Sequence, residues 1–256
     1  MNEIATVIEQ LQNIYDEITV HEGDEHDYLG MIMTHDRENN SVRINMEKYI
    51  EGIIDVFLMD EPDEQVKIVT TPATNNLFKV RTSGMKLSKT CAGIFHATVA
   101  KLLFVAKQAR PDILLAVSFL TTRVKEPDVD DWKKLIRTLG YLRGTMELCL
   151  MIVCESIHKL TWYIDGSYAI HDDMRGQSGA ILMTGNCAVL FRSNKQKVNA
   201  RSLTETELIA VDDALPTVQW TRSFMKDQGY ELETEIKEDN KSTILLMKNG
   251  RLSSGK

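Results

Sequence analysis

The 256-residue chain has few cysteines and no long apolar segment. Its four cysteines lack the paired spacing of a zinc site and nothing requires disulfides, which favours a reducing compartment. The longest strongly apolar run, residues 113–120, is far too short to cross a bilayer, and residue 1 begins no signal-like segment. The sequence also contains no internal repeat and no low-complexity tract. We therefore expect a folded globular chain without a membrane among its partners.

The charge is distributed unevenly along the chain. Residues 1–70 hold 4 Lys and Arg against 17 Asp and Glu, residues 71–158 hold 13 against 7, and residues 159–256 hold 13 against 13. The net charge of −7 taken alone would argue against a nucleic-acid partner. The basic middle third removes that objection, because the negative charge is concentrated in the first 70 residues.

Hydrophobic periodicity in the first part of the chain predicts helices and one β-hairpin. An amphipathic helix occupies the first twenty residues, a hairpin covers 28–34 and 41–45, and a short helix runs over 47–57. Residues 60–90 are polar and contain two prolines, which indicates a long connection of the kind found in linkers or ligand-wrapping loops. Three helices are expected next, over 93–109, 112–124 and 130–142.

The pattern changes near Cys149. Strands are predicted at 159–165, 179–184 and 188–193, the last two joined by a tight Gly-Asn turn. A long helix over 203–228, a strand over 233–238 and a short helix over 241–248 follow. The fold class expected for the whole chain is α+β or mixed α/β, with a small β-hairpin and helical region followed by a mixed sheet with flanking helices.

Three carboxylates in the second part stand where secondary structure changes. Asp165 ends the first predicted strand, Glu207 lies near the start of the long helix, and Asp239 ends the fourth strand. Converging carboxylates are suitable ligands for Mg²⁺, and two such ions can support phosphodiester hydrolysis. The alternatives are ordinary: Asp165 fits a turn residue, and Asp239 fits a helix cap.

Glu207 has a structural alternative of its own. The segment 204–207 matches a capping box in which this glutamate would bond to the cap amide, but 202–205 matches the same box and leaves Glu207 free. At about 100° per residue, Glu207 lies close to the apolar face of the helix, whereas Glu205 and Asp212 point to solvent. A carboxylate directed at the sheet is costly unless it is paired or binds a metal, which favours Glu207 as a ligand.

Two other features are interpreted as structural. His171-Asp172-Asp173 has the composition of a metal cluster, but turn residues surround it, which favours a solvated loop. Trp162 and Trp220 each lie in an apolar pattern and are predicted to be core residues.

Several short blocks, in order, resemble one known family. They are Tyr28-Leu29-Gly30-Met31, Ala109-Arg110-Pro111-Asp112-Ile113, Tyr141-Leu142-Arg143-Gly144-Thr145, Tyr163-Ile164-Asp165, Ser193-Asn194-Lys195-Gln196-Lys197, Thr204-Glu205-Thr206-Glu207 and Glu238-Asp239-Asn240. In this order and spacing, the chain resembles the C-terminal part of the Pol polyprotein of copia-type retrotransposons. That part comprises the end of the reverse transcriptase and most of the ribonuclease H domain.

The resemblance implies two domains and one reaction. Residues 1–148 correspond to the palm end, thumb and connection of the reverse transcriptase, and residues 149–256 to a ribonuclease H-like domain truncated at its C-terminus. The implied activity is hydrolysis of the RNA strand of an RNA–DNA hybrid with two Mg²⁺ ions. Asp165, Glu207 and Asp239 would be the catalytic metal ligands, and the rest of the Pol polyprotein would be a partner.

The chain also departs from the family pattern. The polymerase signature Tyr-Val-Asp-Asp is absent, so no DNA synthesis is expected from this chain alone. The chain stops at Lys256, before the family's closing histidine and fourth acidic residue, so weaker binding of the second Mg²⁺ is expected. The alternative function is a catalytically dead fragment that binds nucleic acid or a Pol partner. The family implies a cytoplasmic particle or the nucleus as its location.

The basic residues have two interpretations. Lys and Arg on consecutive helices often form only a solvated face, but here they could follow the phosphates of a hybrid. The residues predicted to bind nucleic acid are Lys101, Lys107, Arg110, Arg123, Lys133, Lys134, Arg137, Arg143, Lys195 and Lys197.

Overall fold

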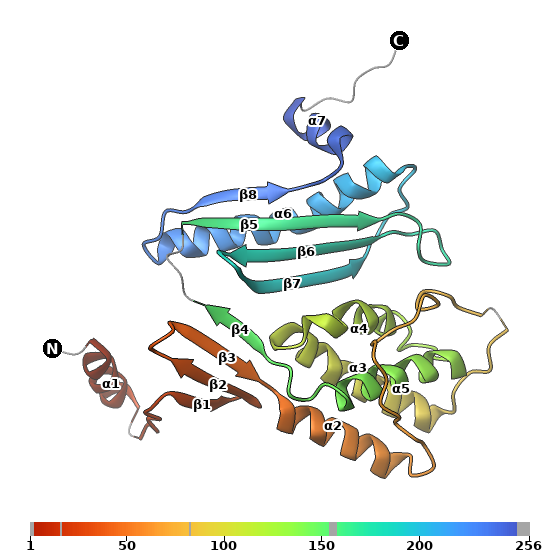
Figure 1. The fold of residues 1–256 in the computed structure, drawn as a ribbon, viewed down its shortest axis with the longest axis horizontal. Helices are drawn as coiled ribbons and strands as arrows, with labels where there is room; N and C mark the ends of the chain where they lie inside the picture. The colour runs from red at the N-terminus through yellow and green to blue at the C-terminus, as the bar shows by residue number, and fades with distance from the viewer. Residues whose placement is uncertain (1–2, 16, 82, 154–157, 250–256) are drawn as a thin grey trace.

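The computed structural model describes residues 3–15, 17–81, 83–153 and 158–249, and it confirms the predicted α+β class. Two four-stranded sheets have the strand orders β1-β2-β3-β4 and β7-β6-β5-β8. Figure 1 shows the second sheet above a group of helices, with the first sheet beside that group.

The first part of the chain forms the smaller sheet and the helical core. Its elements are α1 (Glu3–Ile14), β1 (Glu25–Tyr28), β2 (Met31–Asp36), β3 (Ser41–Asn45), α2 (Glu47–Asp60), α3 (Lys89–Gln108), the 3-10 turn η1 (Pro111–Ile113), α4 (Leu114–Thr121), α5 (Val129–Arg143) and β4 (Leu150–Val153). The predicted hairpin and helices are confirmed. The strand β1 was not expected: it pairs with β2 as a polar, mostly exposed edge strand without an alternating apolar pattern.

The structure also moves the predicted boundary between the two parts. β4 pairs antiparallel with β3, with Leu150 opposite Ile44 and Val153 opposite Ser41. Residues 150–153, which the sequence places in the second domain, therefore complete the first sheet. Local periodicity could not reveal this, because a strand's partner depends on contacts across about a hundred residues of chain.

The long connection between α2 and α3 contains no helix or strand in its described residues, as predicted, but it wraps the helical core rather than acting as a free linker. Val66 and Leu77 are buried in that core. The connection passes so close to α5 that a Cβ on Gly140 would lie 2.1 Å from the carbonyl oxygen of Lys67. Only glycine at position 140 permits this approach.

Helix α3 is the central helix of the first part. By length and composition alone it is long and apolar enough to cross a membrane. In this fold, however, Phe95, Val99 and Leu102 are fully buried among the core residues of the neighbouring helices. Core packing therefore accounts for the apolar residues on the buried side of α3.

The second part of the chain forms the mixed sheet. Its elements are β5 (Lys159–Ser167), β6 (Gln177–Thr184), β7 (Cys187–Lys195), α6 (Leu203–Asp227), β8 (Glu233–Lys237) and α7 (Lys241–Asn249). β5, β6 and β7 are antiparallel neighbours, whereas β8 pairs parallel to β5. α6 packs on one face of this sheet and buries Trp162 completely, as predicted. The core prediction for Trp220 is wrong, because its side chain is 60% exposed and stacks on Phe224.

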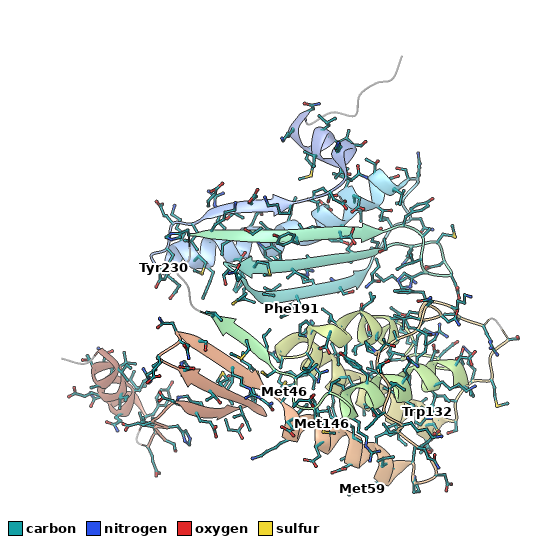
Figure 2. The ribbon with its side chains drawn as sticks, in the orientation of Figure 1. Met46, Met59, Trp132, Met146, Phe191 and Tyr230 are labelled. Carbon is teal, nitrogen blue, oxygen red and sulfur yellow. The ribbon has the colours of Figure 1, made fainter. Side chains whose placement is uncertain are left out.

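The two parts of the chain are joined through β7 and α4. Phe191 of β7, labelled in Figure 2 on the side of the sheet that faces the helices, is buried in the core of the first part. The Ser118 hydroxyl of α4 donates to the carbonyl oxygen of Ser193 at 2.7 Å. The Gln177 side-chain amide donates to the hydroxyls of Ser118 and Ser193, at 3.1 and 2.8 Å. Apolar packing and a buried polar network therefore hold the sheet against the helices.

His171 extends this contact and corrects the prediction of a solvated loop. Its ring is 4% exposed and lies 4.9 Å from the ring of Phe78 and 6.3 Å from that of Phe119. Nε2 donates to the Gln177 amide oxygen at 2.9 Å, because that oxygen can only accept. Asp172 stays exposed. The composition of the segment could not reveal this role, because both phenylalanines come from the first part of the chain.

The buried imidazole predicts a pH-dependent stability. Burial lowers the pKa of His171, and Lys195 lowers it further, while Gln177 and the nearby Asp173 and Asp172 oppose the shift. His171 therefore binds a proton less readily in the folded chain than in the unfolded chain. As a result, the free energy of unfolding falls as the pH drops below about 6.5. The expected loss is at most about 1.4 kcal/mol per pH unit.

Urea unfolding between pH 7.5 and pH 5 measures this effect. His171→Phe keeps an aromatic ring in place but cannot be protonated, so its unfolding free energy should fall less steeply with decreasing pH. His96→Gln, at an exposed position on α3, is the matched control and should follow the parent chain. Parallel curves for the parent chain and His171→Phe would contradict the prediction.

Candidate metal centre and basic surface

The three predicted carboxylates converge although they come from three different elements. Asp165 lies near the end of β5, Glu207 in the second turn of α6, and Asp239 two residues after β8. One carboxylate oxygen from each lies within 4.8 Å of the other two. Three carboxylate oxygens this close together could hold a metal ion.

The parallel pairing of β5 and β8 explains why the two aspartates meet. Tyr163 of β5 lies opposite Lys237 of β8. Asp165 comes two residues after Tyr163, and Asp239 comes two residues after Lys237 along the neighbouring parallel segment. Side chains two residues apart in a strand point to the same face. Parallel pairing therefore carries both carboxylates to the same edge of the sheet.

Local capping leaves Glu207 free, as the sequence indicated. The Ser202 hydroxyl accepts from the Glu205 amide at 3.2 Å, and the Glu205 carboxylate accepts from the Arg201 amide at 2.7 Å. Glu207 is 7% exposed and accepts from the Gly166 amide at 2.7 Å. A Cβ on Gly166 would lie 2.8 Å from the carbonyl oxygen of Thr206, so glycine is needed for this close approach of β5 and α6.

The electrostatics of the cluster favour a cation. Burial, together with the negative charges of Glu238, Asp165 and Asp239, raises the pKa of Glu207 to about 7, against the opposing hydrogen bond from Gly166. A divalent cation would stabilise the ionised glutamate and offset this repulsion. Both the oxygen donors and their mutual repulsion therefore favour binding of a divalent metal ion.

Sequence reasoning missed Glu238 as a member of this environment. Burial raises the pKa of its partly buried carboxyl, and Asp239 and Asp165 add to the effect. Oε1 accepts from the Asn240 amide at 3.0 Å, whereas Oε2 is buried without a hydrogen-bond partner among the described residues. The only available signal was its position next to Asp239 in the Glu-Asp-Asn block.

The cluster opens into a cavity between the sheet and the helices. This cavity has a volume of about 580 Å³ and is lined by Asp165 and Asp239 together with apolar residues, among them Tyr163, Ile181 and Leu114. The Tyr163 side chain is 51% exposed. Asp165 and Asp239 are therefore accessible from this side of the sheet.

Arg110 is not available to nucleic acid, contrary to the prediction. Its side chain is 2% exposed and forms an ion pair with Asp112 at 2.7 Å. The guanidinium also donates to the carbonyl and hydroxyl oxygens of Thr145, both at 2.7 Å, and lies over the Tyr141 ring. These contacts join the end of α3 to the segment after α5, which is a structural role.

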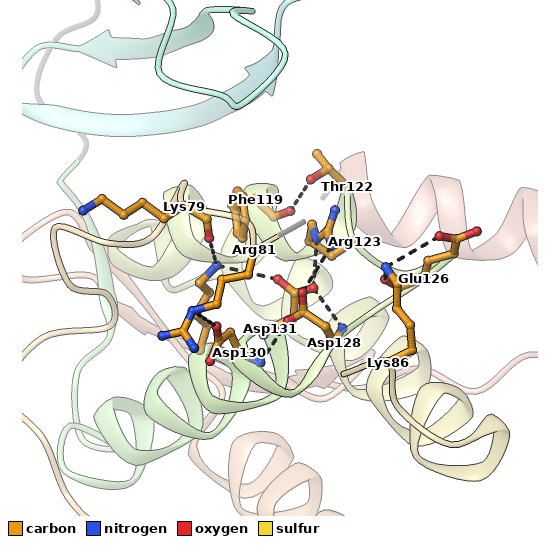
Figure 3. Close-up of polar contacts among 11 residues, drawn as sticks. Lys79, Arg81, Lys86, Phe119, Thr122, Arg123, Glu126, Asp128, Asp130 and Asp131 are labelled. Atoms are coloured by element: carbon orange, nitrogen blue, oxygen red, sulfur yellow. Dashed lines mark hydrogen bonds and ion pairs between the residues drawn. The ribbon is translucent and has the colours of Figure 1, made fainter. Parts of the chain in front are cut away.

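Two further predicted cations belong to a polar network at the start of α5, drawn in Figure 3. Arg123 forms ion pairs with the buried Asp131 at 2.9 Å and Asp128 at 3.7 Å. Lys134 lies 3.6 Å from Asp131, donates to the carbonyl oxygen of Lys79 at 2.7 Å, and lies over the Phe119 ring. Asp128 and Asp131 also form the capping box of α5. Sequence position alone could not separate these paired cations from free ones.

The remaining predicted cations are more accessible to different degrees. Arg137 and Arg143 donate to the 61–88 connection, at Thr71 and Val66. Lys195 pairs with Asp173 at 2.8 Å, and the exposed Lys133 lies 3.8 Å from Asp130. Lys101, Lys107 and Lys197 have neither an ion pair nor a side-chain hydrogen bond within the described part of the chain.

Comparison with known proteins finds retrotransposon proteins among the relatives of this chain. The chain is 30% identical over 227 residues to the retrovirus-related Pol polyprotein from transposon TNT 1-94 of Nicotiana tabacum, a match over 86% of this chain and 17% of that protein. It is 30% identical over 167 residues to the Pol polyprotein from transposon RE2 of Arabidopsis thaliana, over 65% of this chain and 11% of that protein.

A third relative is the transposon Ty5-1 protein YCL074W of Saccharomyces cerevisiae, which is 29% identical over 195 residues, covering 73% of this chain and 59% of that protein. The chain thus spans less than two thirds of the length of each of these relatives. No protein-family model and no solved structure matches the chain. The similarity covers most of the chain, and we conclude that the chain belongs to the Pol polyprotein family of copia-type retrotransposons.

Proposed function

We propose that the second part of the chain is a Mg²⁺-dependent ribonuclease H that hydrolyses the RNA strand of RNA–DNA hybrids. The observation that carries this proposal is the convergence of Asp165, Glu207 and Asp239, whose oxygens lie within 4.8 Å of one another. The family relation adds support, since the chain matches segments of retrotransposon Pol polyproteins. The mixed sheet with α6 on one face agrees with the ribonuclease H-like domain that the sequence resemblance implied.

The three carboxylates have different positions and therefore different tasks. Bound Mg²⁺ would supply charge stabilisation for the phosphate and a more acidic water as the nucleophile. Glu207 is held by the Gly166 amide, so its carboxylate keeps one orientation at the inner side of the site. Asp165 and Asp239 are exposed at the sheet edge, where their oxygens face the cavity through which a nucleic-acid strand would approach.

A strand-cleavage assay tests the proposal. An RNA–DNA hybrid labelled on either strand is incubated with the full chain and Mg²⁺, beside single-stranded RNA, duplex DNA and a reaction with EDTA. We expect cleavage of the RNA strand in the hybrid alone, and none with EDTA. The Asp165→Asn chain, purified in the same way, controls for a contaminating nuclease.

The outcomes separate the proposal from its alternative. No cleavage of any substrate, or equal cleavage by the parent and Asp165→Asn chains, would overturn the ribonuclease proposal. Salt-dependent binding of the hybrid without cleavage would instead support a catalytically inactive member of the family that binds nucleic acid. If the chain binds another segment of a Pol polyprotein and has no affinity for the hybrid, this would support a catalytically inactive fragment that binds a Pol partner.

A further inference from the structure

A second cavity lies where the two parts of the chain meet, away from the three carboxylates. Its volume is about 520 Å³, and its walls come from α3, α4, β7 and α6. This volume is within the range of small-ligand sites, about 300–1,000 Å³. The polar side chains that matter for its chemistry are Lys107, Ser118, Thr121, Arg192, Asn194 and Thr217.

Among the described residues, the lining of this cavity contains two cations and no carboxylate. Arg192 donates from Nη1 to the Thr217 hydroxyl, and it has no ion pair within the described part of the chain. Lys107, in the last turn of α3, is exposed and has no ion pair or side-chain hydrogen bond among the described residues. In contrast, Arg110, Arg123 and Lys134 are all neutralised by aspartates.

The neighbouring hydroxyls show which donors are available. Ser118 donates to the Ser193 carbonyl oxygen and Thr121 to the Ser118 carbonyl oxygen, so both hydroxyl protons are in use. The side-chain amide of Asn194 has no hydrogen-bond partner among the described residues. Lys107, Arg192 and Asn194 therefore supply free donors, with one end of the guanidinium anchored by Thr217.

We propose that this cavity binds a phosphate group of a nucleic-acid backbone, with Arg192 and Lys107 as the charged ligands. A guanidinium forms two parallel hydrogen bonds to phosphate oxygens, and an ammonium adds a compact charge. Anchoring at Thr217 reduces the rotational freedom that Arg192 would lose on binding. The sequence did not single out Arg192. The pattern of a strand does not show whether an arginine on it has an acidic partner in the folded chain.

The position of the cavity favours a backbone phosphate over a free anion. Arg192 and Ser193 of β7 line both this cavity and the one that contains Asp165 and Asp239. A strand placed at the carboxylates could therefore present another phosphate to Arg192. A third cavity is lined by Arg192, Asn194, Lys195 and Lys197 together with Asp212 and Asp213, and these carboxylates give it a weaker preference for an anion than the second cavity has.

The inference rests on the nucleic-acid substrate of the proposed function but not on its hydrolysis, so binding is measured in EDTA. The full chain is titrated into a fluorescent RNA–DNA hybrid at several salt concentrations, and inorganic phosphate is titrated separately by calorimetry. The variants are Lys107→Gln, Arg192→Gln and Arg192→Lys. Lys89→Gln, at the exposed start of α3, is the matched control for loss of one positive charge on the same helix.

We expect Lys107→Gln and Arg192→Gln each to weaken hybrid binding about tenfold, the effect of losing one charge-assisted hydrogen bond. Each should also reduce the dependence of log affinity on log salt by about 0.7–0.9, as for one lost phosphate contact. Arg192→Lys should recover only part of the affinity, because an ammonium cannot form the fork. Lys89→Gln should leave both quantities unchanged.

Unchanged hybrid affinity in Lys107→Gln and in a folded Arg192→Gln would overturn the proposal, and melting curves establish whether Arg192→Gln is folded. Lys107 is exposed, so Lys107→Gln is expected to fold. This variant therefore still tests the proposal if Arg192→Gln unfolds. Phosphate binding that depends on both residues, combined with unchanged hybrid affinity, would overturn the backbone assignment in favour of a free anion. Failure of RNA cleavage in the Mg²⁺ assay would contradict the ribonuclease proposal and leave this binding result unaffected.

Discussion

Replacing Asp165 with Asn is expected to reduce RNA-strand cleavage by at least about a hundredfold while stabilising the chain in the absence of metal. Loss of groups that only support a metal ligand typically costs about 10–100-fold, and removal of a ligand should cost more. The substitution should stabilise the chain because the negative charge of Asp165 repels the buried Glu207. This repulsion is the third largest cause of the raised pKa of Glu207, after burial and the charge of Glu238. Asparagine keeps the shape of the side chain and removes this repulsion.

Melting curves with and without Mg²⁺, measured beside cleavage rates, test both parts of this expectation. Mg²⁺ should raise the melting temperature of the parent chain, because a ligand that binds only the folded state stabilises it. Asp165→Asn should melt higher than the parent in EDTA and show little response to Mg²⁺. Asp172→Asn, which removes an exposed carboxylate outside the cluster, should match the parent in both measurements. An equal Mg²⁺ response in Asp165→Asn and the parent would contradict the proposed metal site.

Gly166→Ala should lower cleavage about a hundredfold, although the new methyl group carries no charge. The added Cβ would lie 2.8 Å from the Thr206 carbonyl oxygen, so α6 must move away from β5. That movement would displace Glu207, which follows Thr206 and is held by the Gly166 amide. A misplacement of about 1 Å in a catalytic group can cost about a hundredfold in rate.

Gly179→Ala is the matched control for this variant. Gly179 lies opposite Asp165 on the neighbouring strand, but an added Cβ would meet only the Asp165 carbonyl oxygen, at 3.7 Å. This is an ordinary contact distance, so Gly179→Ala should keep most of the activity. Cleavage rates and Mg²⁺-dependent melting are compared for the two variants. Equal activity in both would show that the spacing of β5 and α6 is not critical for the site.

The candidate metal centre could be predicted from the sequence because each of its parts has a local signal. Strand and helix boundaries placed Asp165 and Asp239 at strand ends, and helical geometry directed Glu207 toward the sheet. The choice between two capping boxes was also local, and the contacts of Ser202 and Glu205 agree with it. Glu238 had no such signal, because its burial depends on the packing around the loop after β8.

The basic residues show the limit of this reasoning. Sequence position grouped ten cations as equivalent, but the tertiary structure buries Arg110 and pairs Arg123 and Lys134 with aspartates. It also leaves Arg192, which was not predicted, beside Lys107 in a cavity whose described lining residues include no carboxylate. The partner of a charged side chain is set by contacts between distant segments, which periodicity does not encode.

By itself, the sequence determined the α+β class, most of the helices and strands, and the three carboxylates, because these depend on local periodicity and capping. Only the tertiary structure decided that β4 completes the first sheet, that His171 packs between Phe78 and Phe119, and which cations stay unpaired. Each of these features joins residues far apart in the chain. Their energies come from burial and pairing in the assembled core, which no local window of the sequence contains.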